Sequence, residues 1–392
     1  MSKPYLSLGL MSGTSMDGVD VSIIQSDGDT QYNGLFDRYY EYSEDIYKNL
    51  SNLRDKITKN KKPNNNKILL ESLSQEFNEL EKKITLFHLD IVSEVLKETN
   101  LPVDLIGFHG QTVFHNPEEN TSQKNKSIQL GNGKLLSKLL NKTVVYNFRE
   151  NDLKNGGVGA PLTPIFHLLF AKKKLKQNEL PALILNLGGI ANITLINNFA
   201  NNENSLFASD IGPGNCLIDK WVRKKTKKRY DESGSVAKSG KVNKVILDKA
   251  IRNWINGLEN NFRQPVSHDI GDYDYSFANN LSLEDGAATI TAYSSEIYSH
   301  FINKITDDNS YPKLIIVCGG GRKNEFLMKS FQNKIDCPLV KIDDFDIDGD
   351  FIESQAFAYL AIRSFLKLPI SFPSTTGVKM PCDGGDIIKV KK

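Results

Sequence analysis

A strand, a glycine-containing turn and a second strand are indicated in residues Leu8–Ile24, and the same pattern returns in Ala182–Ile196. This repeat constrains the fold most, because apolar runs on both sides of a turn predict paired strands. Helical patterns follow, one of them running from Leu73 to Lys97 with apolar residues spaced three and four apart. The sequence therefore predicts an α/β fold with two similar halves that could face each other as a clamp.

The turn inside the first hairpin is rich in groups that bind ligands. Its glycines would let the main chain approach a ligand without a Cβ in the way. Its hydroxyls can donate hydrogen bonds, and its carboxylates could hold a metal-bound phosphate or a substrate hydroxyl. A polar hairpin loop without chemistry is the alternative that this stretch leaves open. The residues concerned are Gly13, Thr14, Ser15, Asp17, Gly18 and Asp20.

Two further glycine turns follow apolar strands, at Gly188-Gly189 and at Gly319-Gly320-Gly321. Backbone N–H groups in such turns can hold phosphate oxygens, which suits a nucleotide held between two domains. Ordinary tight turns are the alternative for each of them. The Walker and Rossmann patterns are both absent from the sequence, so a nucleotide site would be of the hairpin-clamp kind.

Length, charge and cysteine usage narrow the class of protein. A chain of 392 residues is too long for one ordinary core, so two domains are expected. The net charge of +2 argues against a surface dedicated to nucleic acid or membranes, and no apolar run reaches transmembrane length. The four cysteines show no CxxC spacing. They are typical of reduced thiols in a cytoplasmic protein.

Composition also suggests where the chain is divided. The glycine- and proline-containing stretch Asn147–Pro164 predicts a hinge, with the domain boundary near Phe148. Residues Tyr32–Lys67 are mostly polar and poorly periodic, and their last part, Lys56–Lys67, predicts a surface loop or insertion. An apolar run at Val103–Phe108 predicts a buried strand with polar residues at its end.

Four charged or titratable side chains are candidates for chemistry. Asp210, before a Gly-Pro-Gly turn, is a candidate general base, with helix N-capping as the alternative. Glu353, at the start of a largely apolar helix, could be a functional acid or could interact with the helix dipole. Arg149 could clamp an anion or form a structural ion pair, and His109 could bind a sugar hydroxyl or be a core histidine. The histidine spacing predicts no transition-metal site built by the protein.

The stretch LGLMSGTSMDGVD resembles the signature of the anhydro-N-acetylmuramic acid kinase family. Further motifs of that family follow in order along nearly the whole chain, and the combination is far more specific than any one motif. They are His109-Gly110-Gln111-Thr112, Gln129-Leu130-Gly131-Asn132, Gly156-Gly157-Val158-Gly159-Ala160-Pro161-Leu162, Asn186-Leu187-Gly188-Gly189, Asp210-Ile211-Gly212-Pro213-Gly214-Asn215, Cys318-Gly319-Gly320-Gly321 and Glu353.

The resemblance implies the fold of the acetate and sugar kinase/actin superfamily, with two ribonuclease-H-like domains around a cleft. The first domain would take residues 1–148 and 369–392, and the second would take residues 149–368. The resemblance also implies ATP and Mg²⁺ as cofactors and an anhydrosugar as substrate. It leaves the oligomeric state open, a homodimer being one expectation.

The implied reaction is an unusual phosphoryl transfer. Water would open the 1,6-anhydro ring while the freed 6-oxygen takes the γ-phosphate, giving N-acetylmuramic acid 6-phosphate during peptidoglycan recycling. Asp210 would activate the water with Glu353 as a supporting acid, and Asp17, His109 and Arg149 would bind the sugar. The nucleotide-binding residues implied are Gly13, Thr14, Ser15, Met16, Asp17, Gly18, Val19, Asp20, Gly188, Gly189, Gly319, Gly320 and Gly321.

Two positions depart from the family pattern. The family commonly has a Lys-Ser pair after a proline, where this chain reads Pro265-Val266-Ser267. The family usually has glutamine where this chain has Val158. The sequence separates the muramic substrate poorly from another 1,6-anhydrosugar such as levoglucosan. A non-catalytic nucleotide-binding clamp is the alternative from another class, and the presence of both Asp210 and Glu353 argues against it.

Overall fold

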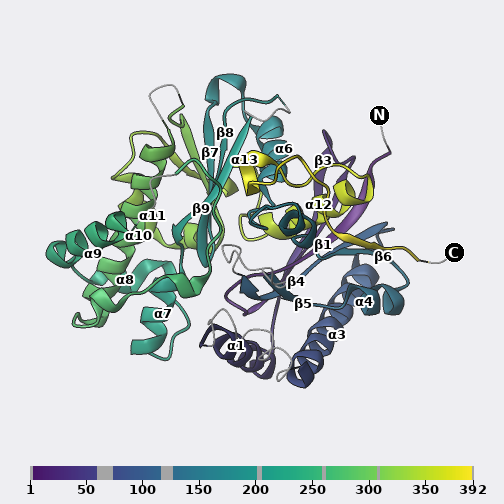
Figure 1. Cartoon of the computed structure of the whole chain (residues 1–392), viewed down its shortest axis with the longest axis horizontal. Coiled ribbons are helices and arrows are strands. Elements are labelled where there is room, and N and C mark those ends of the chain that lie inside the picture. Colours follow the sequence, from purple (N-terminus) through teal and green to yellow (C-terminus); the bar gives the residue numbers. More distant parts are fainter. Residues whose placement is uncertain are drawn as a thin grey trace. The chain divides into compact units, whose positions relative to one another are not determined.

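The computed structural model describes residues 3–59, 74–115, 127–200, 205–257, 262–306 and 310–390. The chain divides into two compact units (Figure 1). Unit 1 comprises Met1–Leu169 together with Phe351–Lys392, and unit 2 comprises Phe170–Asp350. Within the described ranges, every helix is too short or too polar to cross a bilayer.

These bounds differ from the ones expected from composition. The glycine-rich stretch 147–164 belongs entirely to unit 1, where the Val158 N–H donates to the Thr376 carbonyl at 2.8 Å. The chain passes into unit 2 within helix α6 (Pro164–Lys174), after Leu169. It returns at Phe351 rather than at Pro369, because the helix that follows packs on the sheet of unit 1. The glycine and proline content correctly indicated a loop, but it did not indicate the residue at which the chain passes from unit 1 into unit 2.

Unit 1 is built on a seven-stranded mixed sheet in the order β12-β6-β4-β1-β2-β3, with β5 paired to β4. Strand β1 runs antiparallel to β2 and parallel to β4, and β4 runs parallel to β6. The elements are β1 (Tyr5–Ser12), β2 (Gly18–Ser26), β3 (Tyr32–Glu41), α1 (Glu44–Lys59), α3 (Ser74–Thr99), β4 (Leu105–His115), β5 (Ser127–Leu130), α4 (Gly133–Leu140), β6 (Thr143–Tyr146), α5 (Glu150–Lys154), α6, α12 (Ile352–Phe365), α13 (Pro373–Thr376) and β12 (Asp386–Ile388).

Alternation along β1 separates the two faces of this sheet. Leu8 and Leu10 are fully buried in the core formed with α1 and α3. Gly9 points the other way, and a Cβ there would lie 2.0 Å from the Ser354 carbonyl of α12. Figure 1 accordingly shows the yellow helix α12 among the purple and blue strands. The helix α12, which comes late in the chain, therefore covers one face of a sheet made mainly by the first 150 residues.

The expected surface loop at Lys56–Lys67 is wrong over its described part, because residues 56–59 belong to α1. The mostly polar stretch before it forms β3 and the rest of α1. Strand β3 pairs with β2 along its length, but it is an edge strand with exposed and half-buried positions, so it has no apolar run. Helix α1 buries a stripe of four apolar residues, Ile46, Leu50, Leu53 and Ile57, in an otherwise polar sequence. The rest of the predicted insertion, from residue 60, and the polar stretch 116–126 lie outside the described residues.

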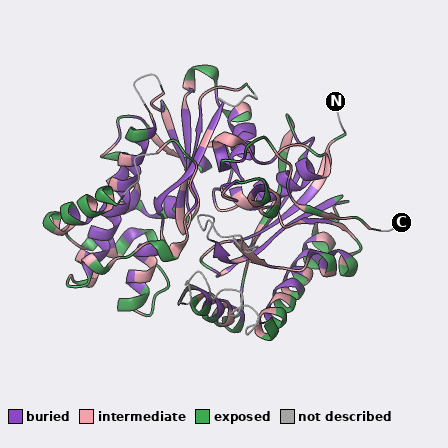
Figure 2. Cartoon of the chain, viewed as in Figure 1, coloured by how far each residue is buried: buried purple, intermediate pink, exposed green. Residues whose placement is uncertain are grey.

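Unit 2 contains a five-stranded sheet in the order β11-β10-β7-β8-β9. Leucines of β7 belong to the same buried apolar core as Trp221 and other apolar residues of the helices. Figure 2 shows the strands of this sheet coloured largely as buried. The elements are η1 (Gln177–Glu179), β7 (Ala182–Leu187), β8 (Ile190–Ile196), β9 (Leu206–Pro213), α7 (Cys216–Lys225), η2 (Glu232–Gly234), α8 (Ser235–Ser239), α9 (Lys244–Asn256), η3 (Ile270–Asp272), η4 (Ser276–Ala278), α10 (Leu283–Ile305), β10 (Leu314–Cys318), η5 (Gly320–Lys323), α11 (Glu325–Gln332), β11 (Leu339–Lys341) and η6 (Ile342–Phe345).

The two sheets share one topology. In each, three strands form an antiparallel meander, β1–β3 in unit 1 and β7–β9 in unit 2. One strand, β4 or β10, then pairs in parallel with the first strand of the meander, and a further strand, β6 or β11, pairs in parallel with that one. This is the ribonuclease-H-like arrangement. The predicted α/β class with two similar units, each opening with a hairpin, is confirmed.

Candidate functional site

The two glycines of the β1–β2 turn have different reasons to be glycine. A Cβ at Gly13 would have only the Ser15 hydroxyl within 4 Å, at 3.9 Å, so the main chain there is open to a ligand. A Cβ at Gly18 would lie 2.4 Å from the Tyr40 carbonyl, so Gly18 is required by the pairing of β2 with β3. Only Gly13 fits the predicted close approach of the backbone to a ligand.

Two residues assigned to nucleotide binding direct their side chains into the protein core. Met16 is 1% exposed and Val19 is fully buried, and both belong to the apolar core of unit 1. Met16 has a φ of 59°, so it holds the turn in a left-handed conformation while its side chain anchors the turn. Met16 and Val19 can therefore offer a ligand only their main-chain atoms. Asp17, which is half-buried, accepts a hydrogen bond from the Ser15 hydroxyl at 2.6 Å.

A buried glutamine that the sequence reasoning did not assign braces this turn. The Gln111 Nε2 donates to the Gly13 carbonyl at 2.9 Å, and its Oε1 accepts from the Ser12 hydroxyl at 2.5 Å. Gln111 lies within β4, which continues to His115 because its last residues pair with β5. The expected strand end at Phe108 is therefore wrong. In the sequence, Gln111 is visible only as part of a motif. Its contact with Ser12 spans 99 positions, and no local pattern reveals it.

His109 and Arg149, both expected at the sugar site, contact each other directly. The His109 Nδ1 lies 2.8 Å from the Gly110 carbonyl, which makes it the protonated nitrogen, and the Nε2 accepts from the Arg149 guanidinium at 3.0–3.2 Å. Burial, and then the charge of Arg149, lowers the pKa of His109 well below its usual 6.5. The imidazole is therefore neutral, and it holds one edge of the guanidinium by accepting hydrogen bonds from it. Arg149 also donates to the Gly159 carbonyl at 2.8 Å.

Asp152 lies in α5, three residues after Arg149, and it binds the same residue, Gly159, through the main-chain N–H. Its carboxylate is fully buried and accepts from the Gly159 N–H at 2.6 Å. Burial raises the pKa of Asp152. Because Gly159 is bonded to both side chains, Asp152 helps to hold the partner of Arg149 in place. Sequence reasoning placed Asp152 only in a hinge, since nothing in its local pattern indicated burial.

Glu353 lies in the first turn of α12 and is half-buried. The next two residues tie the helix to the sheet of unit 1. The Ser354 hydroxyl is 2.6 Å from that of Ser22, and the Gln355 amide donates to both carboxylate oxygens of Asp37 at 3.0 Å. The position of Glu353 in unit 1 is therefore well determined by its neighbours, whatever its role.

Asp210 lies within β9, which continues beyond it to Pro213. It pairs with Asn192 beside a register shift of one residue, and such bulges often re-aim side chains next to active sites. Its side chain is almost wholly buried. Helix capping by Asp210 is wrong, because α7 begins at Cys216 and has Asn215 at its N-cap.

The segment 265–268 holds the Asp210 carboxylate. One carboxylate oxygen, Oδ2, accepts from the His268 N–H at 2.8 Å and from the Ser267 hydroxyl at 3.2 Å. The Asp210 N–H donates to the Val266 carbonyl at 3.0 Å. Val266 stands where the family commonly has lysine, but its contact uses the backbone, which every residue type provides. The departure from the family pattern therefore leaves this support intact.

A tyrosine lies close behind the carboxylate. The Tyr273 ring lies 5.6 Å from the His268 ring, measured between centroids. Burial, and then the charge of Asp210, raises the pKa of Tyr273 well above 10. The phenol consequently stays protonated and adds no negative charge beside Asp210.

The predicted glycine turns of unit 2 meet at one end of its sheet. The turn after β9 binds back to the first of them, since the Gly214 N–H donates to Gly189 at 3.0 Å and the Asn215 N–H donates to Gly188 at 2.8 Å. A Cβ at Gly319 would lie 2.4 Å from the Asn186 side-chain oxygen, so this turn packs against the end of β7. The sequence signal for this end of the sheet, glycine directly after an apolar strand, was correct.

Not every glycine in these turns is there for packing. A Cβ at Gly188 would meet nothing closer than 3.5 Å, and one at Gly320 would meet nothing closer than 4.0 Å. Both backbones therefore have open space beside them, as a bound phosphate would require.

The structure thus assembles the predicted residues as two groups, one on each unit. On unit 1, Gln111 joins the Gly13 turn to β4, and His109 binds Arg149. On unit 2, the glycine turns follow β7 and β10, and Asp210 lies within β9, which pairs with the strand after the first of these turns. Among the described residues, no group of three His, Cys, Asp or Glu side chains is placed to hold a metal ion.

Comparison with known proteins places the chain in a family. The model of the family described as anhydro-N-acetylmuramic acid kinase matches residues 5–389. The anhydro-N-acetylmuramic acid kinase of Pelagibacter ubique is 52% identical over 99% of this chain and 100% of that protein. The one from Zymomonas mobilis is 39% identical over 97% of this chain and 99% of that protein. Among solved structures, a ROK family glucokinase from Streptomyces griseus aligns over 91% of this chain and 99% of its own, with 10% identity and a TM-score of 0.40. By the family model and these relatives, the chain belongs to the anhydro-N-acetylmuramic acid kinase family.

Proposed function

We propose that this chain opens 1,6-anhydro-N-acetylmuramic acid with water and phosphorylates the freed 6-oxygen from ATP, producing N-acetylmuramic acid 6-phosphate in peptidoglycan recycling. The observation that carries the proposal is the support of Asp210 in a chain of this family. A nearly buried carboxylate receives two hydrogen bonds on one oxygen, from Ser267 and His268. Such a fixed carboxylate suits a general base.

The proposed reaction transfers one proton to Asp210 and one phosphoryl group to the sugar. Water adds to the anomeric carbon, the bond from that carbon to O6 breaks, and Asp210 accepts the proton that the water loses. The O6 takes the γ-phosphoryl group and ADP leaves, so the atoms balance with one proton released. Glu353 is proposed as the supporting acid. The neutral His109 and its partner Arg149 are proposed to bind the sugar, with His109 and the Gly159 carbonyl holding the guanidinium in place.

The nucleotide is assigned to the glycine turns and to the Gly13 turn. A magnesium ion that arrives with ATP keeps several waters and needs only one or two protein carboxylates. Asp17 and Asp20 in unit 1 are carboxylates of this kind, so the residues present fit such an ion without a site built by the protein alone. When bound, the ion would neutralise phosphate charge during transfer. The four cysteines form no disulfide with one another, which agrees with a reaction in the reducing cytoplasm.

The test is ADP release by the purified protein with ATP and Mg²⁺, comparing 1,6-anhydro-N-acetylmuramic acid with levoglucosan. We expect turnover with the muramic substrate alone and a product carrying one phosphate on O6, identified by mass and phosphorus NMR. The Asp210→Asn variant, assayed with the same sugars, gives the ADP release that does not depend on the proposed base.

Each alternative predicts a different result. Preference for levoglucosan would keep the mechanism and contradict the assigned substrate. Binding of ATP without turnover on either sugar would favour a non-catalytic clamp and contradict the proposal.

A further inference from the structure

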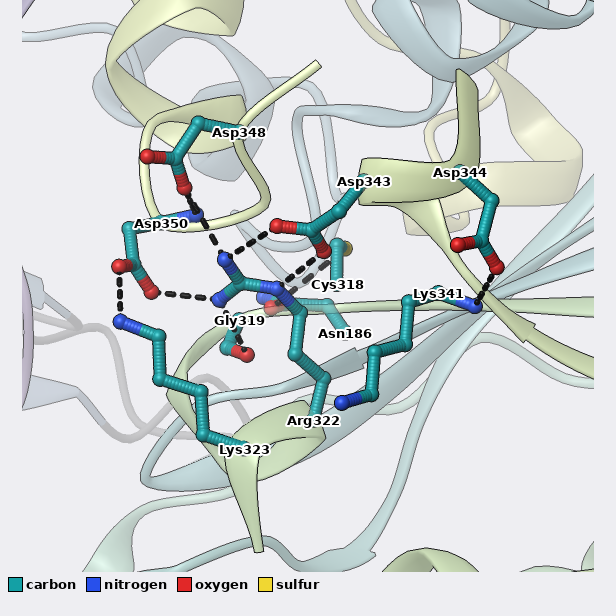
Figure 3. Close-up of polar contacts among 10 residues, drawn as sticks. All are labelled: Asn186, Cys318, Gly319, Arg322, Lys323, Lys341, Asp343, Asp344, Asp348 and Asp350. Atoms are coloured by element: carbon teal, nitrogen blue, oxygen red, sulfur yellow. Dashed lines mark hydrogen bonds and ion pairs between the residues drawn. The ribbon is translucent and has the colours of Figure 1, made fainter. Parts of the chain in front are cut away.

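Arg322 directly follows the last glycine turn of unit 2, and its side chain is only 3% exposed. A buried guanidinium is costly unless its charge and its N–H groups are paired. Figure 3 shows how the pairing is achieved, with three carboxylates arranged around Arg322. They belong to Asp343, Asp348 and Asp350, in the segment that ends unit 2.

Every N–H of this guanidinium has a partner. The Nε and one terminal nitrogen bind the two oxygens of Asp343 at 2.6 and 2.8 Å. That nitrogen also donates to Asp348 at 3.0 Å, and the other binds Asp350 at 2.5 Å and the Gly319 carbonyl at 3.2 Å. A guanidinium has five N–H donors, and these contacts use all five. Arg322 therefore has no donor left for a phosphate.

The contacts connect two pieces of backbone. The Gly319 carbonyl belongs to the glycine turn, whereas Asp350 is the last residue of unit 2 before the chain returns to unit 1. The same two pieces are joined through the main chain, because the Gly319 N–H donates to the Gly349 carbonyl at 3.0 Å. A Cβ at Gly349 would lie 2.4 Å from the Arg322 Nε, so the segment fits closely against the guanidinium.

We propose that Arg322 is a positioning residue for the nucleotide, acting through the turn Gly319–Gly321 and not by contact with phosphate. It holds both the carbonyl of Gly319 and the segment against which that turn rests. Gly319 has a φ of 76°, a conformation that glycine adopts readily and other residues rarely do. The inference rests on the proposed use of ATP, and it specifies which buried group shapes the site.

The test measures binding of a non-hydrolysable ATP analogue by calorimetry, together with KM for ATP and for the sugar. We expect Arg322→Lys to weaken analogue binding at least tenfold and to raise KM for ATP in proportion. A lysine has one ammonium group and cannot reproduce the fork that spans three carboxylates and a carbonyl. The KM for the sugar should change less than twofold.

The matched control is Lys323→Met. Lys323 is exposed and forms an ion pair with Asp350, but it has no described bond to the glycine turn. This variant should bind the analogue within twofold of the unaltered chain. If Arg322→Lys does not fold, Asp343→Asn provides the second variant, because its half-exposed side chain loses the two-point contact while keeping its volume. We expect it to weaken analogue binding at least threefold.

The outcomes separate this inference from the proposed function. Lower thermal stability with unchanged analogue affinity in both variants would show a merely structural role and overturn the inference. An unaltered chain that binds no analogue would overturn the proposed use of ATP, and this inference with it.

Discussion

The carboxylate of Asp210 is the residue on which the proposed chemistry depends most directly. We expect Asp210→Asn to lower kcat by roughly 10²–10⁴, the usual contribution of a positioned base. An amide cannot accept the proton of the attacking water, but it keeps the size of the side chain. Nucleotide affinity should stay within twofold, as measured by calorimetry. Near-normal turnover in this variant would remove Asp210 from the role of base.

Ser267 tests whether the support of that carboxylate matters. Its hydroxyl supplies one of two hydrogen bonds to Asp210 Oδ2. A hydrogen bond to a charged group contributes about 1.5–3 kcal/mol, so Ser267→Ala should lower kcat by roughly 10- to 100-fold and leave KM little changed. The matched control is Ser295→Ala in α10, a buried serine that bonds only to the Thr291 carbonyl of its own helix. Equal kcat values for the two variants would mean that the hydroxyl does not position the base.

Individual residues were predictable where a motif carried them and not where long-range contacts did. Asp210 and the glycine turns lie in short recognisable motifs, and the structure places them at one end of a sheet. Ser267 reaches Asp210 across 57 positions, and Gln111 reaches Ser12 across 99. No local pattern encodes such pairs. Met16 shows what a motif leaves open, since membership of the motif does not tell that its side chain is buried in the core and that only its main chain can meet a ligand.

At the scale of elements, the packing of α12 on the first sheet makes a sharp prediction about two glycines. A Cβ at Gly107 of β4 would lie 2.3 Å from the Phe357 carbonyl of α12. We expect Gly107→Ala to lower the free energy of unfolding by about 1–3 kcal/mol, the usual cost of overpacking. Gly13→Ala is the matched control, because its Cβ would meet only open space. That variant should be as stable as the unaltered chain in urea unfolding, whatever it does to activity. Equal midpoints for both variants would contradict the close packing of α12.

Elements were predictable in proportion to their apolar content. The strands at the centres of both sheets and the long helix α3 were recognised, because burial gives them continuous or periodic apolar residues. Strand β3 and helix α1 were missed. An edge strand and a surface helix need only a few buried side chains, and their remaining residues resemble those of a loop. The boundary between the units was misplaced for a related reason, since the crossing lies inside a helix and has no sequence signature of its own.

At the scale of the whole molecule, acid should affect the two units differently. Unit 1 contains four buried histidines, His88, His109, His115 and His167. Burial lowers the pKa of His88 to about 4 and that of His167 to about 3. Below pH 6.5 the unfolded chain binds protons that these folded imidazoles do not. Their stabilising contribution is therefore complete above pH 6.5 and falls by about 1.4 kcal/mol per pH unit for each residue as the pH drops toward the folded pKa. Asp152, with its raised pKa, opposes this in part.

Unit 2 should respond in a lower pH range. Hydrogen bonds from Arg322 hold the pKa of Asp343 below its usual 3.8. At Asp350, burial raises the pKa of the carboxyl, but hydrogen bonds from Lys323 and Arg322 outweigh burial, so that its pKa is also lowered. A carboxylate with a lowered pKa stabilises the fold above the unfolded value and loses that contribution as the pH falls below about 4. His300, which is only partly buried, adds a smaller effect at higher pH.

Urea unfolding at pH 7, 6 and 5 can separate these responses. Both tryptophans, Trp221 and Trp254, lie in unit 2, so tryptophan fluorescence reports that unit, whereas circular dichroism reports both. Between pH 7 and pH 5 we expect the first midpoint seen by circular dichroism to fall more than the fluorescence midpoint. Midpoints that coincide and fall together would mean that the units unfold as one.

The discontinuity of unit 1 has a consequence for biosynthesis. A ribosome delivers the strands that carry Gly9 and Gly107 early, but the helix that covers them only after all of Phe170–Asp350. At bacterial elongation rates that delay amounts to roughly 10–35 s. During this interval the nascent sheet exposes an apolar face while unit 2, which is continuous, has everything it needs to fold. The amino-terminal half of this protein can consequently complete its fold only after the carboxyl-terminal segment has been synthesised.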